Sequence, residues 1–238
     1  SEKFRLMKTK IFCDIADNKK IKKFQKKKIV DGFTTNPSLM RAAGAKNYKD
    51  YSLRLAKVCK NKPISFEVFA DNPKEMIKQA FIINSFGKNV YVKVPVVNSK
   101  GVFMGPAIKE LSNKGIKLNI TAVYTFNQTK KIYKKLNKKT KSIISIFAGR
   151  MADKGKDPLP IFKKSISLTK KNKNIEILWA STREPYNYIQ ATQLKCNIIT
   201  MPPKMIIQVE NFGKSFKEMT LNTVKGFLKD SKKSKFKL

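Results

Sequence analysis

Eight short runs rich in β-branched and other apolar residues recur along the chain, and polar residues separate each run from a longer segment that follows it. The runs span residues 10–16, 29–36, 64–70, 90–96, 117–123, 142–150, 175–182 and 196–202. Segments such as 38–60, 72–86 and 126–137 carry apolar residues three and four positions apart, as amphipathic helices do. Eight strand–helix units predict an α/β fold, a (β/α)8 TIM barrel. A doubly wound open sheet is the alternative, but no glycine-rich phosphate fingerprint follows the first run.

The length of the chain suits one such barrel. It has 238 residues, of which 41% are hydrophobic, and α/β barrels of this size form one domain. We therefore expect a single domain over residues 1–238, with a core at about 10–230 and flexible ends at 1–9 and 231–238. Residues 204–230 favour an extra C-terminal helix. Its apolar side chains available for packing are Phe212, Phe216, Met219, Val224 and Phe227.

Residue usage narrows the chemistry. The chain has no histidine, which removes Ser-His-Asp and Cys-His nucleophile pairs, histidine-bearing zinc sites and histidine acid/base catalysis. Catalysis must then use Lys, Asp, Glu, Tyr, Ser or Thr, and we expect no metal site. Cys13, Cys59 and Cys196 are too few and too far apart for a disulfide framework, which fits a reducing cytoplasm. No apolar run approaches the roughly 18 residues of a membrane span, and no targeting segment is expected.

The net charge of +36 comes almost entirely from lysine. The lysines are spread over four separate segments, 22–28, 130–141, 163–173 and 225–237. Nucleic-acid-binding patches normally cluster on one face and mix arginine with exposed aromatic residues. We therefore favour a solvated lysine coat, with no specific nucleic acid as partner. Binding of a polyanion on a non-catalytic barrel, of a membrane surface or of an acidic partner remains the alternative.

One lysine differs from the others in its setting. Lys93 lies inside the apolar run Val90-Tyr91-Val92-Lys93-Val94-Pro95-Val96-Val97, which reads as a buried strand. An unpaired ammonium group there would cost several kcal/mol or lose its proton. A neutral lysine amine is the nucleophile with which enzymes form Schiff bases with carbonyl substrates. The alternative is that Lys93 lies near a strand end and extends its amine to solvent.

Polar residues gather at the carboxyl ends of the predicted strands, where the active site of a TIM barrel forms. In chain order they are Asp14, Thr34, Thr35, Asn36, Glu67, Lys93, Asn119, Thr121, Ser145, Arg150, Ser181 and Arg183. Asn119 and Thr121 are two positions apart and so share one face of a strand.

Each of these residues also has a structural interpretation. Asp14 could cap the following helix, and Glu67 could be an ion-pair partner. The segment 34–37 could be only a turn into a helix, with Asn36 held extended by the proline after it. Asn119, Thr121 and Ser145 could be interior polar groups with internal hydrogen bonds.

Five motifs together resemble the short-form transaldolases. They are Asp31-Gly32-Phe33-Thr34-Thr35-Asn36-Pro37-Ser38-Leu39, Val92-Lys93-Val94-Pro95, Ile116-Lys117-Leu118-Asn119-Ile120-Thr121, Ile146-Phe147-Ala148-Gly149-Arg150 and Trp179-Ala180-Ser181-Thr182-Arg183. The resemblance runs from Lys10 to Asp230, and with Asp14 and Glu67 it falls in order at seven of the eight predicted strands.

The resemblance implies a role for each residue. Lys93 would form the Schiff base, Asp14 would be the general acid/base, and Glu67 with Thr121 would position a water molecule. The residues implied in substrate binding are Thr34, Asn36, Asn119, Ser145 and Phe147. Arg150, Ser181 and Arg183 would hold the phosphate, for which a planar guanidinium offers paired donors. Only five arginines occur in the chain, and two of them fall at this predicted phosphate site, although coincidence is the alternative.

The resemblance also implies an activity. Members that cleave fructose 6-phosphate as free aldolases carry Gln, Leu and Tyr where this chain has Glu67, Asn119 and Phe147, so the chain follows the transaldolase pattern. The expected reaction transfers a dihydroxyacetone unit from sedoheptulose 7-phosphate or fructose 6-phosphate to an aldose phosphate, in the pentose phosphate pathway and without a cofactor. A free aldolase is the alternative within this family. Relatives are commonly oligomeric, so the resemblance also implies a homo-oligomer.

Overall fold

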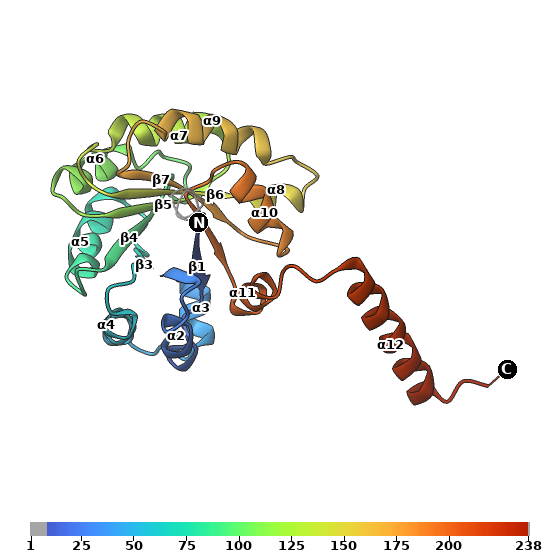
Figure 1. The fold of residues 1–238 in the computed structure, drawn as a ribbon. Coiled ribbons are helices and arrows are strands. Elements are labelled where there is room, and N and C mark those ends of the chain that lie inside the picture. The colour runs from blue at the N-terminus through green and yellow to red at the C-terminus, as the bar shows by residue number, and fades with distance from the viewer. Residues whose placement is uncertain (1–8, 238) are drawn as a thin grey trace.

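The computed structural model describes residues 9–237 and contains a closed barrel of eight parallel strands that follow one another in chain order (Figure 1). The strands are β1 (Lys10–Asp14), β2 (Val30–Thr34), β3 (Ile64–Glu67), β4 (Val90–Pro95), β5 (Leu118–Val123), β6 (Ser142–Phe147), β7 (Ile175–Ala180) and β8 (Ile198–Met201). β8 pairs with β1, so the sheet closes on itself. The predicted barrel is confirmed, and the open sheet is wrong.

Helices follow the strands and, apart from α12, form the outer layer (Figure 1). They are α2 (Asn18–Gln25), α3 (Pro37–Ala42), α4 (Tyr48–Cys59), α5 (Pro73–Asn84), α6 (Gly105–Asn113), α7 (Phe126–Lys135), α8 (Ala148–Ala152), α9 (Leu159–Thr169), α10 (Tyr186–Gln193), α11 (Pro203–Glu210) and α12 (Phe216–Ser234). Several begin at a residue whose side chain accepts a hydrogen bond from a backbone amide three positions on, which satisfies a free donor of the first turn. These capping residues are Asp17, Asn36, Asn47, Asn72 and Thr125.

The predicted strands are too long at their carboxyl ends. The third run was expected to continue to residue 70, but β3 ends at Glu67, and the sixth was expected to reach Arg150, but β6 ends at Phe147. Arg150 therefore lies in the short helix α8 and not in a strand. The chain turns into α8 at Ala148 and Gly149, where it passes directly over the end of β7.

The core has an inner and an outer part. Inside the barrel lies a small buried cluster of Phe12, Tyr91, Ile143, Leu178, Ala180 and Ile198. The larger cluster fills the space between the barrel and its helices. Phe12, Tyr91 and Ile143 face a cavity at the N-terminal mouth of the barrel, whereas Leu178 and Ala180 face one at the C-terminal mouth. The inner cluster thus separates two cavities at opposite ends of the strands.

The C-terminal segment differs from its prediction. The expected helix over 204–230 is two helices, α11 and α12, and Gly213 between them has φ +103°. The apolar side chains expected to pack are exposed, from 45% for Phe212 to 86% for Phe216. α12 extends away from the barrel and has no buried residue (Figure 1).

The ends of the chain were predicted to be flexible, at residues 1–9 and 231–238, and the structure describes part of each. Residues 1–8 lie outside the described residues, but Thr9 is buried and donates a hydrogen bond to the Cys196 carbonyl at 2.8 Å. At the other end α12 continues to Ser234, into the segment expected to be frayed. Among the described helices, none combines the length and hydropathy needed to cross a membrane.

Candidate active site

A cavity of about 210 Å³ opens at the carboxyl ends of the strands. It collects all but one of the residues predicted to form the catalytic, substrate and phosphate sites: Asp14, Thr34, Asn36, Lys93, Asn119, Thr121, Ser145, Phe147, Arg150, Ser181 and Arg183. The exception is Glu67, which does not line the cavity but lies next to Lys93 in the parallel register of β3 and β4. The sequence therefore predicted a set of side chains that the fold brings together.

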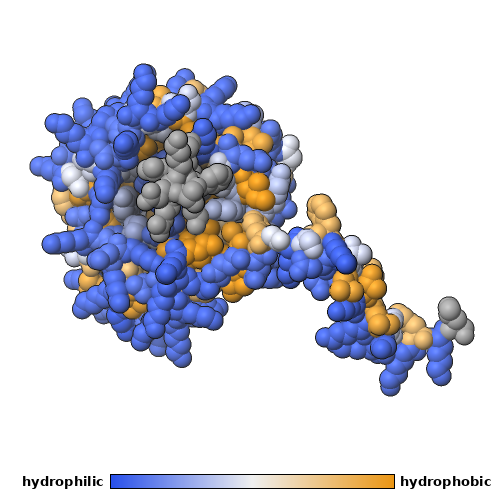
Figure 2. All heavy atoms as spheres, viewed as in Figure 1, coloured by the Kyte–Doolittle hydropathy of each residue, from blue (hydrophilic) through white to orange (hydrophobic). Residues whose placement is uncertain are grey.

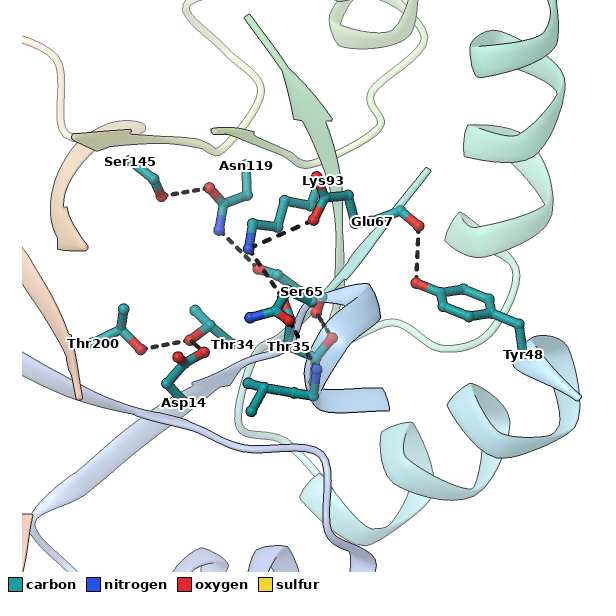
Figure 3. Close-up of polar contacts among 12 residues, drawn as sticks. Asp14, Thr34, Thr35, Tyr48, Ser65, Glu67, Lys93, Asn119, Ser145 and Thr200 are labelled. Carbon is teal, nitrogen blue, oxygen red and sulfur yellow. Dashed lines mark hydrogen bonds and ion pairs between the residues drawn. The ribbon is translucent and has the colours of Figure 1, made fainter. Parts of the chain in front are cut away.

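Lys93 is held in the middle of β4, and its side chain is almost fully buried, with the residue 8% exposed. Its Nζ donates a hydrogen bond to the Thr35 carbonyl at 3.0 Å, and Glu67 Oε2 lies 3.9 Å away (Figure 3). Burial raises the pKa of the Glu67 carboxyl, while the charge of Lys93 opposes this rise. Lys93 does not extend to solvent from a strand end, so that alternative is wrong.

Asp14 ends β1 and is held by a pair of threonines. The Thr34 hydroxyl donates to Asp14 Oδ1 at 2.8 Å, and since this uses its proton, it accepts from the Thr200 hydroxyl at 2.5 Å (Figure 3). Burial raises the pKa of Asp14, whereas Lys93 and the Thr34 hydrogen bond lower it. Asp14 does not cap the next helix, because Asp17 does so. A buried carboxyl of this kind is suited to exchange a proton with a substrate.

β5 contributes two polar residues that differ in their hydrogen bonding. Asn119 is bonded at both ends: its amide donates to Ser65 Oγ at 3.0 Å and its carbonyl oxygen accepts from Ser145 Oγ at 2.6 Å (Figure 3). Thr121 Oγ1 is buried and has no hydrogen-bond partner among residues 9–237. The register of β5 with β6 shifts between Ile120 and Val123, where Ala122 has φ +62°. This irregularity next to Thr121 is of the type often found beside active sites.

Asn36 has two functions in the structure. Its Oδ1 accepts from the Leu39 amide at 2.9 Å and so caps α3, and its ψ of 165° is the extended conformation expected before Pro37. The turn into a helix is thus present as expected, but the segment is not only a turn. The residue also lines the cavity, so the Nδ2 group can still donate to a bound molecule.

The predicted phosphate residues lie on one side of the cavity. Arg183 makes a bidentate pair with Asp153, with Nη2 to Oδ2 at 2.8 Å and Nε to both oxygens at 3.1 Å. This pairing lowers the pKa of Asp153 and raises that of Arg183. Arg150 is exposed, and its guanidinium lies 5.8 Å from the centre of the Phe147 ring. Ser181 has φ +60° and a buried hydroxyl without a partner among residues 9–237.

Gly149 allows this side of the cavity to form. A Cβ at this position would lie 1.8 Å from the Ser181 carbonyl oxygen and 2.7 Å from Arg183 Cγ. Only a glycine lets the start of α8 approach the chain after β7 this closely. This close approach brings together the backbone segments that carry Arg150, Ser181 and Arg183.

Two residues of the site were missed in the sequence. Thr200 lies in β8 and would have been found by asking which polar side chains interrupt an apolar strand. Asp153 follows α8 in a charged surface segment, and no signal in the sequence indicates that it pairs with Arg183. Among residues 9–237, no group of three or more histidine, cysteine or acidic side chains is placed to hold a metal ion.

Comparison with known proteins relates the whole barrel to one family. A sequence model described as "Transaldolase/Fructose-6-phosphate aldolase" matches residues 11–238. The chain is 34% identical to a "Probable transaldolase" of Nitrosopumilus maritimus, covering 88% of this chain and 96% of that protein. It is 33% identical to a "Probable transaldolase" of Herpetosiphon aurantiacus, covering 84% and 86%.

Solved structures show a likeness in fold. The structure of KGPDC from Streptococcus mutans in complex with D-R5P has a TM-score of 0.53, covering 81% of this chain and 86% of that one. The two sequences are 10% identical, so the likeness concerns the barrel alone.

Proposed function

Because the chain belongs to the transaldolase/fructose-6-phosphate aldolase family, we propose that it moves a dihydroxyacetone unit between sugar phosphates through a Schiff base on Lys93. The donor would be sedoheptulose 7-phosphate or fructose 6-phosphate and the acceptor an aldose phosphate, as in the pentose phosphate pathway. The observation that carries the proposal is a lysine amine buried on a strand and opening into a polar cavity. We place the reaction in the cytoplasm, because the cysteine usage suits a reducing compartment.

The first half of the proposed reaction joins substrate and enzyme. After giving up a proton, the Lys93 amine adds to the C2 carbonyl of the donor, and loss of water leaves an iminium ion. This step needs a group that delivers a proton to the departing hydroxyl. Glu67 has an oxygen 3.9 Å from Lys93 Nζ, and the Thr121 hydroxyl has no partner among residues 9–237, so both are suited to hold the water that carries this proton.

The second half breaks and remakes a carbon–carbon bond. Asp14 takes the proton of the C4 hydroxyl as the C3–C4 bond breaks, and the bonding electrons move into the iminium to give an enamine on Lys93. An aldose phosphate leaves with C4 as its new aldehyde carbon. The acceptor aldehyde then reacts with the enamine in the reverse sense, Asp14 returns the proton, and water releases the product from Lys93.

The arginines support a phosphorylated substrate in this proposal. Arg150 has no carboxylate within 4 Å among residues 9–237, so its donors are free for a phosphate. Arg183 uses Nε and Nη2 on Asp153, which leaves Nη1 for the ligand. Ser181 adds a hydroxyl to the same cavity lining.

Reductive trapping tests the proposal directly. Fructose 6-phosphate with borohydride should leave a three-carbon or six-carbon adduct on Lys93, mapped by mass spectrometry. Lys93→Arg should abolish both the adduct and transfer, while Lys131→Arg, on the exposed face of α7, should retain both. An adduct on another lysine would show that Lys93 is not the nucleophile. When the donor is supplied without an acceptor, the reaction should stop at the enamine. Steady release of dihydroxyacetone would instead indicate a free aldolase.

We also propose that copies of the chain associate through α12. This helix of 19 residues has a capping box at Ser215 and Glu218 but no buried residue, and its apolar side chains form a strip (Figure 2). They are Phe216, Met219, Leu221, Val224, Phe227 and Leu228. Most helical stability in proteins comes from packing of an apolar face against another surface, so the strip needs a partner surface. The barrel itself exposes Phe81 and Ile82 on α5, which gives a second copy an apolar surface to offer.

Light scattering at two salt concentrations tests the association. The full chain should be oligomeric at both, while Phe216→Asp with Phe227→Asp should shift it toward monomer. Lys225→Asp with Lys229→Asp changes the opposite side of α12 and should leave the mass unchanged. A monomeric full chain at both salt concentrations would refute the proposal.

A further inference from the structure

The N-terminal mouth of the barrel carries a ring of lysines that the proposed reaction does not use. Each lysine is the first residue of a strand or lies within four residues before one, on six of the eight strands. They are Lys10, Lys60, Lys88, Lys117, Lys141 and Lys173. Since the strands are parallel and the sheet is closed, these positions come to one end of the barrel, opposite Lys93. Sequence alone shows dispersed lysines, and only the barrel brings these six together.

The ring surrounds a cavity of about 630 Å³, three times the volume of the catalytic one. Its floor consists of Phe12, Tyr91 and Ile143, three buried residues of the inner cluster. Asn61 adds a side-chain amide to the lining, whereas the Asn89 amide already donates to the carbonyls of Ala56 and Lys62. The space is therefore concave, has an apolar floor and is lined with hydrogen-bond donors above it.

The positive charge of this cavity is poorly balanced. Asp31 and Glu176 are the two carboxylates of the lining, and both are already engaged. Asp31 Oδ2 accepts from the Ile11 amide at 2.9 Å, and Glu176 pairs with Lys10 at 2.5 Å. Among residues 9–237, Lys10 is the one lysine of the ring within 4 Å of a carboxylate. The lining thus sets six lysines against two carboxylates, an excess of four positive charges among the described residues at this mouth.

Lys117 shows the effect of this crowding. Its Nζ is held over the Tyr91 ring, 5.0 Å from the ring centre, and donates to the Lys88 carbonyl. Burial and the nearby charge of Lys141 lower the pKa of Lys117. Crowded like charges destabilise a fold, and a bound anion would remove that cost.

We propose that this mouth is a second ligand site, which binds a small anion with several phosphate groups. The ligand class follows from the shape: five or six point charges around a concave space suit a chain of phosphates better than a single one. A nucleic acid duplex or a protein would reach only the rim, whereas an inorganic polyphosphate can enter. The site is at the opposite end of the barrel from the Schiff-base lysine and does not depend on the proposed reaction.

Titration with inorganic tripolyphosphate at about 0.15 M salt tests this site, with calorimetry and thermal unfolding as measurements. The wild-type chain should bind and unfold at a higher temperature. Lys117→Gln with Lys141→Gln should weaken binding at least about tenfold, or about 1.4 kcal/mol. Lys131→Gln with Lys135→Gln removes the same charge from exposed positions of α7 and should have little effect. If binding weakens equally in both variants, tripolyphosphate binds through the general surface charge of the chain and the proposal is refuted.

Two further measurements separate the remaining outcomes. Arg150→Gln with Arg183→Gln should bind tripolyphosphate normally, and loss of binding there would place the anion at the other mouth. Mass spectrometry after amine acylation of the unmodified chain requires no variant and covers the case in which a substituted chain fails to fold. Tripolyphosphate should protect Lys117 and Lys141 from acylation and leave Lys131 unprotected. Equal labelling with and without the anion would overturn the proposal.

Discussion

Gly149 offers the most direct test of how one wall of the candidate site is built, the wall that carries the proposed phosphate ligands Arg150, Ser181 and Arg183. In Gly149→Ala the new Cβ would lie 1.8 Å from the Ser181 carbonyl oxygen. Real Cβ atoms essentially never come within 3.0 Å of a non-neighbouring heavy atom. The two segments must therefore separate by at least about 1.2 Å. The neighbouring atom is backbone, so a side-chain rotation cannot relieve the clash. Ser181 and Arg183 would move away from Arg150, and the three proposed phosphate ligands would no longer converge.

The magnitude follows from this displacement. A misplacement of about 1 Å in a positioning group costs about 10²-fold in rate, and overpacking costs about 1–3 kcal/mol in stability. We expect kcat/KM for fructose 6-phosphate to fall about 10²-fold. The value for unphosphorylated fructose should change much less, because that substrate does not use the wall. Steady-state kinetics with both donors and thermal unfolding measure the two effects.

A matched glycine provides the control. Gly226 lies in α12, and a Cβ added there would have no heavy atom within 4 Å, so Gly226→Ala should leave both kinetic values unchanged. A folded Gly149→Ala chain that retains wild-type kcat/KM for fructose 6-phosphate would refute the reasoning. An equal loss for both donors would mean that the displacement reaches beyond the phosphate wall.

The hydrogen bonds around Asp14 and Asn36 give two further predictions. Thr34→Val removes the hydroxyl that lowers the pKa of Asp14, and since Asp14 must be ionised to accept a proton, the acid limb of the pH profile of kcat/KM should move to higher pH. The control is Thr140→Val, which removes a hydroxyl that donates to the Ser112 carbonyl and should leave the acid limb where it is. An acid limb that does not move in Thr34→Val would contradict this role for Asp14. Asn36→Asp keeps the cap of α3 but loses the amide donor, so the free energy of unfolding should be nearly unchanged while the transfer rate falls. Asn36→Ala loses both, so its transfer rate should fall and its stability should decrease by about 1 kcal/mol. Equal stability of the two variants in chemical denaturation would contradict the capping role.

The barrel could be predicted because its signal is local and repeated. Each strand is a short apolar run with its own boundaries, and eight in a row allow few arrangements. Their carboxyl ends were predicted too far along the chain, since apolar residues continue into the loops and into α8. Arg150 reached the cavity from that helix, so its proposed role did not depend on the strand boundary.

The missed features arise from tertiary contacts. Thr200 meets Thr34 only because β8 closes against β1, and Asp153 meets Arg183 only because α8 lies over the end of β7. The exposure of α12 could not be predicted for a similar reason. An amphipathic pattern states that a helix has an apolar face but not what covers it.

The contact between Thr34 and Thr200 has a consequence for the order of biosynthesis. A ribosome delivers β4 and its lysine when fewer than half of the residues have been made, but the hydroxyl that completes the support of Asp14 arrives with β8, near residue 200. The nascent chain therefore carries the Lys93 amine long before the hydrogen bonds that hold the Asp14 carboxyl are complete. Activity should therefore appear only in chains long enough to include β8. If chains of increasing length are released during translation and assayed, activity should rise abruptly at the length at which β8 can join the barrel.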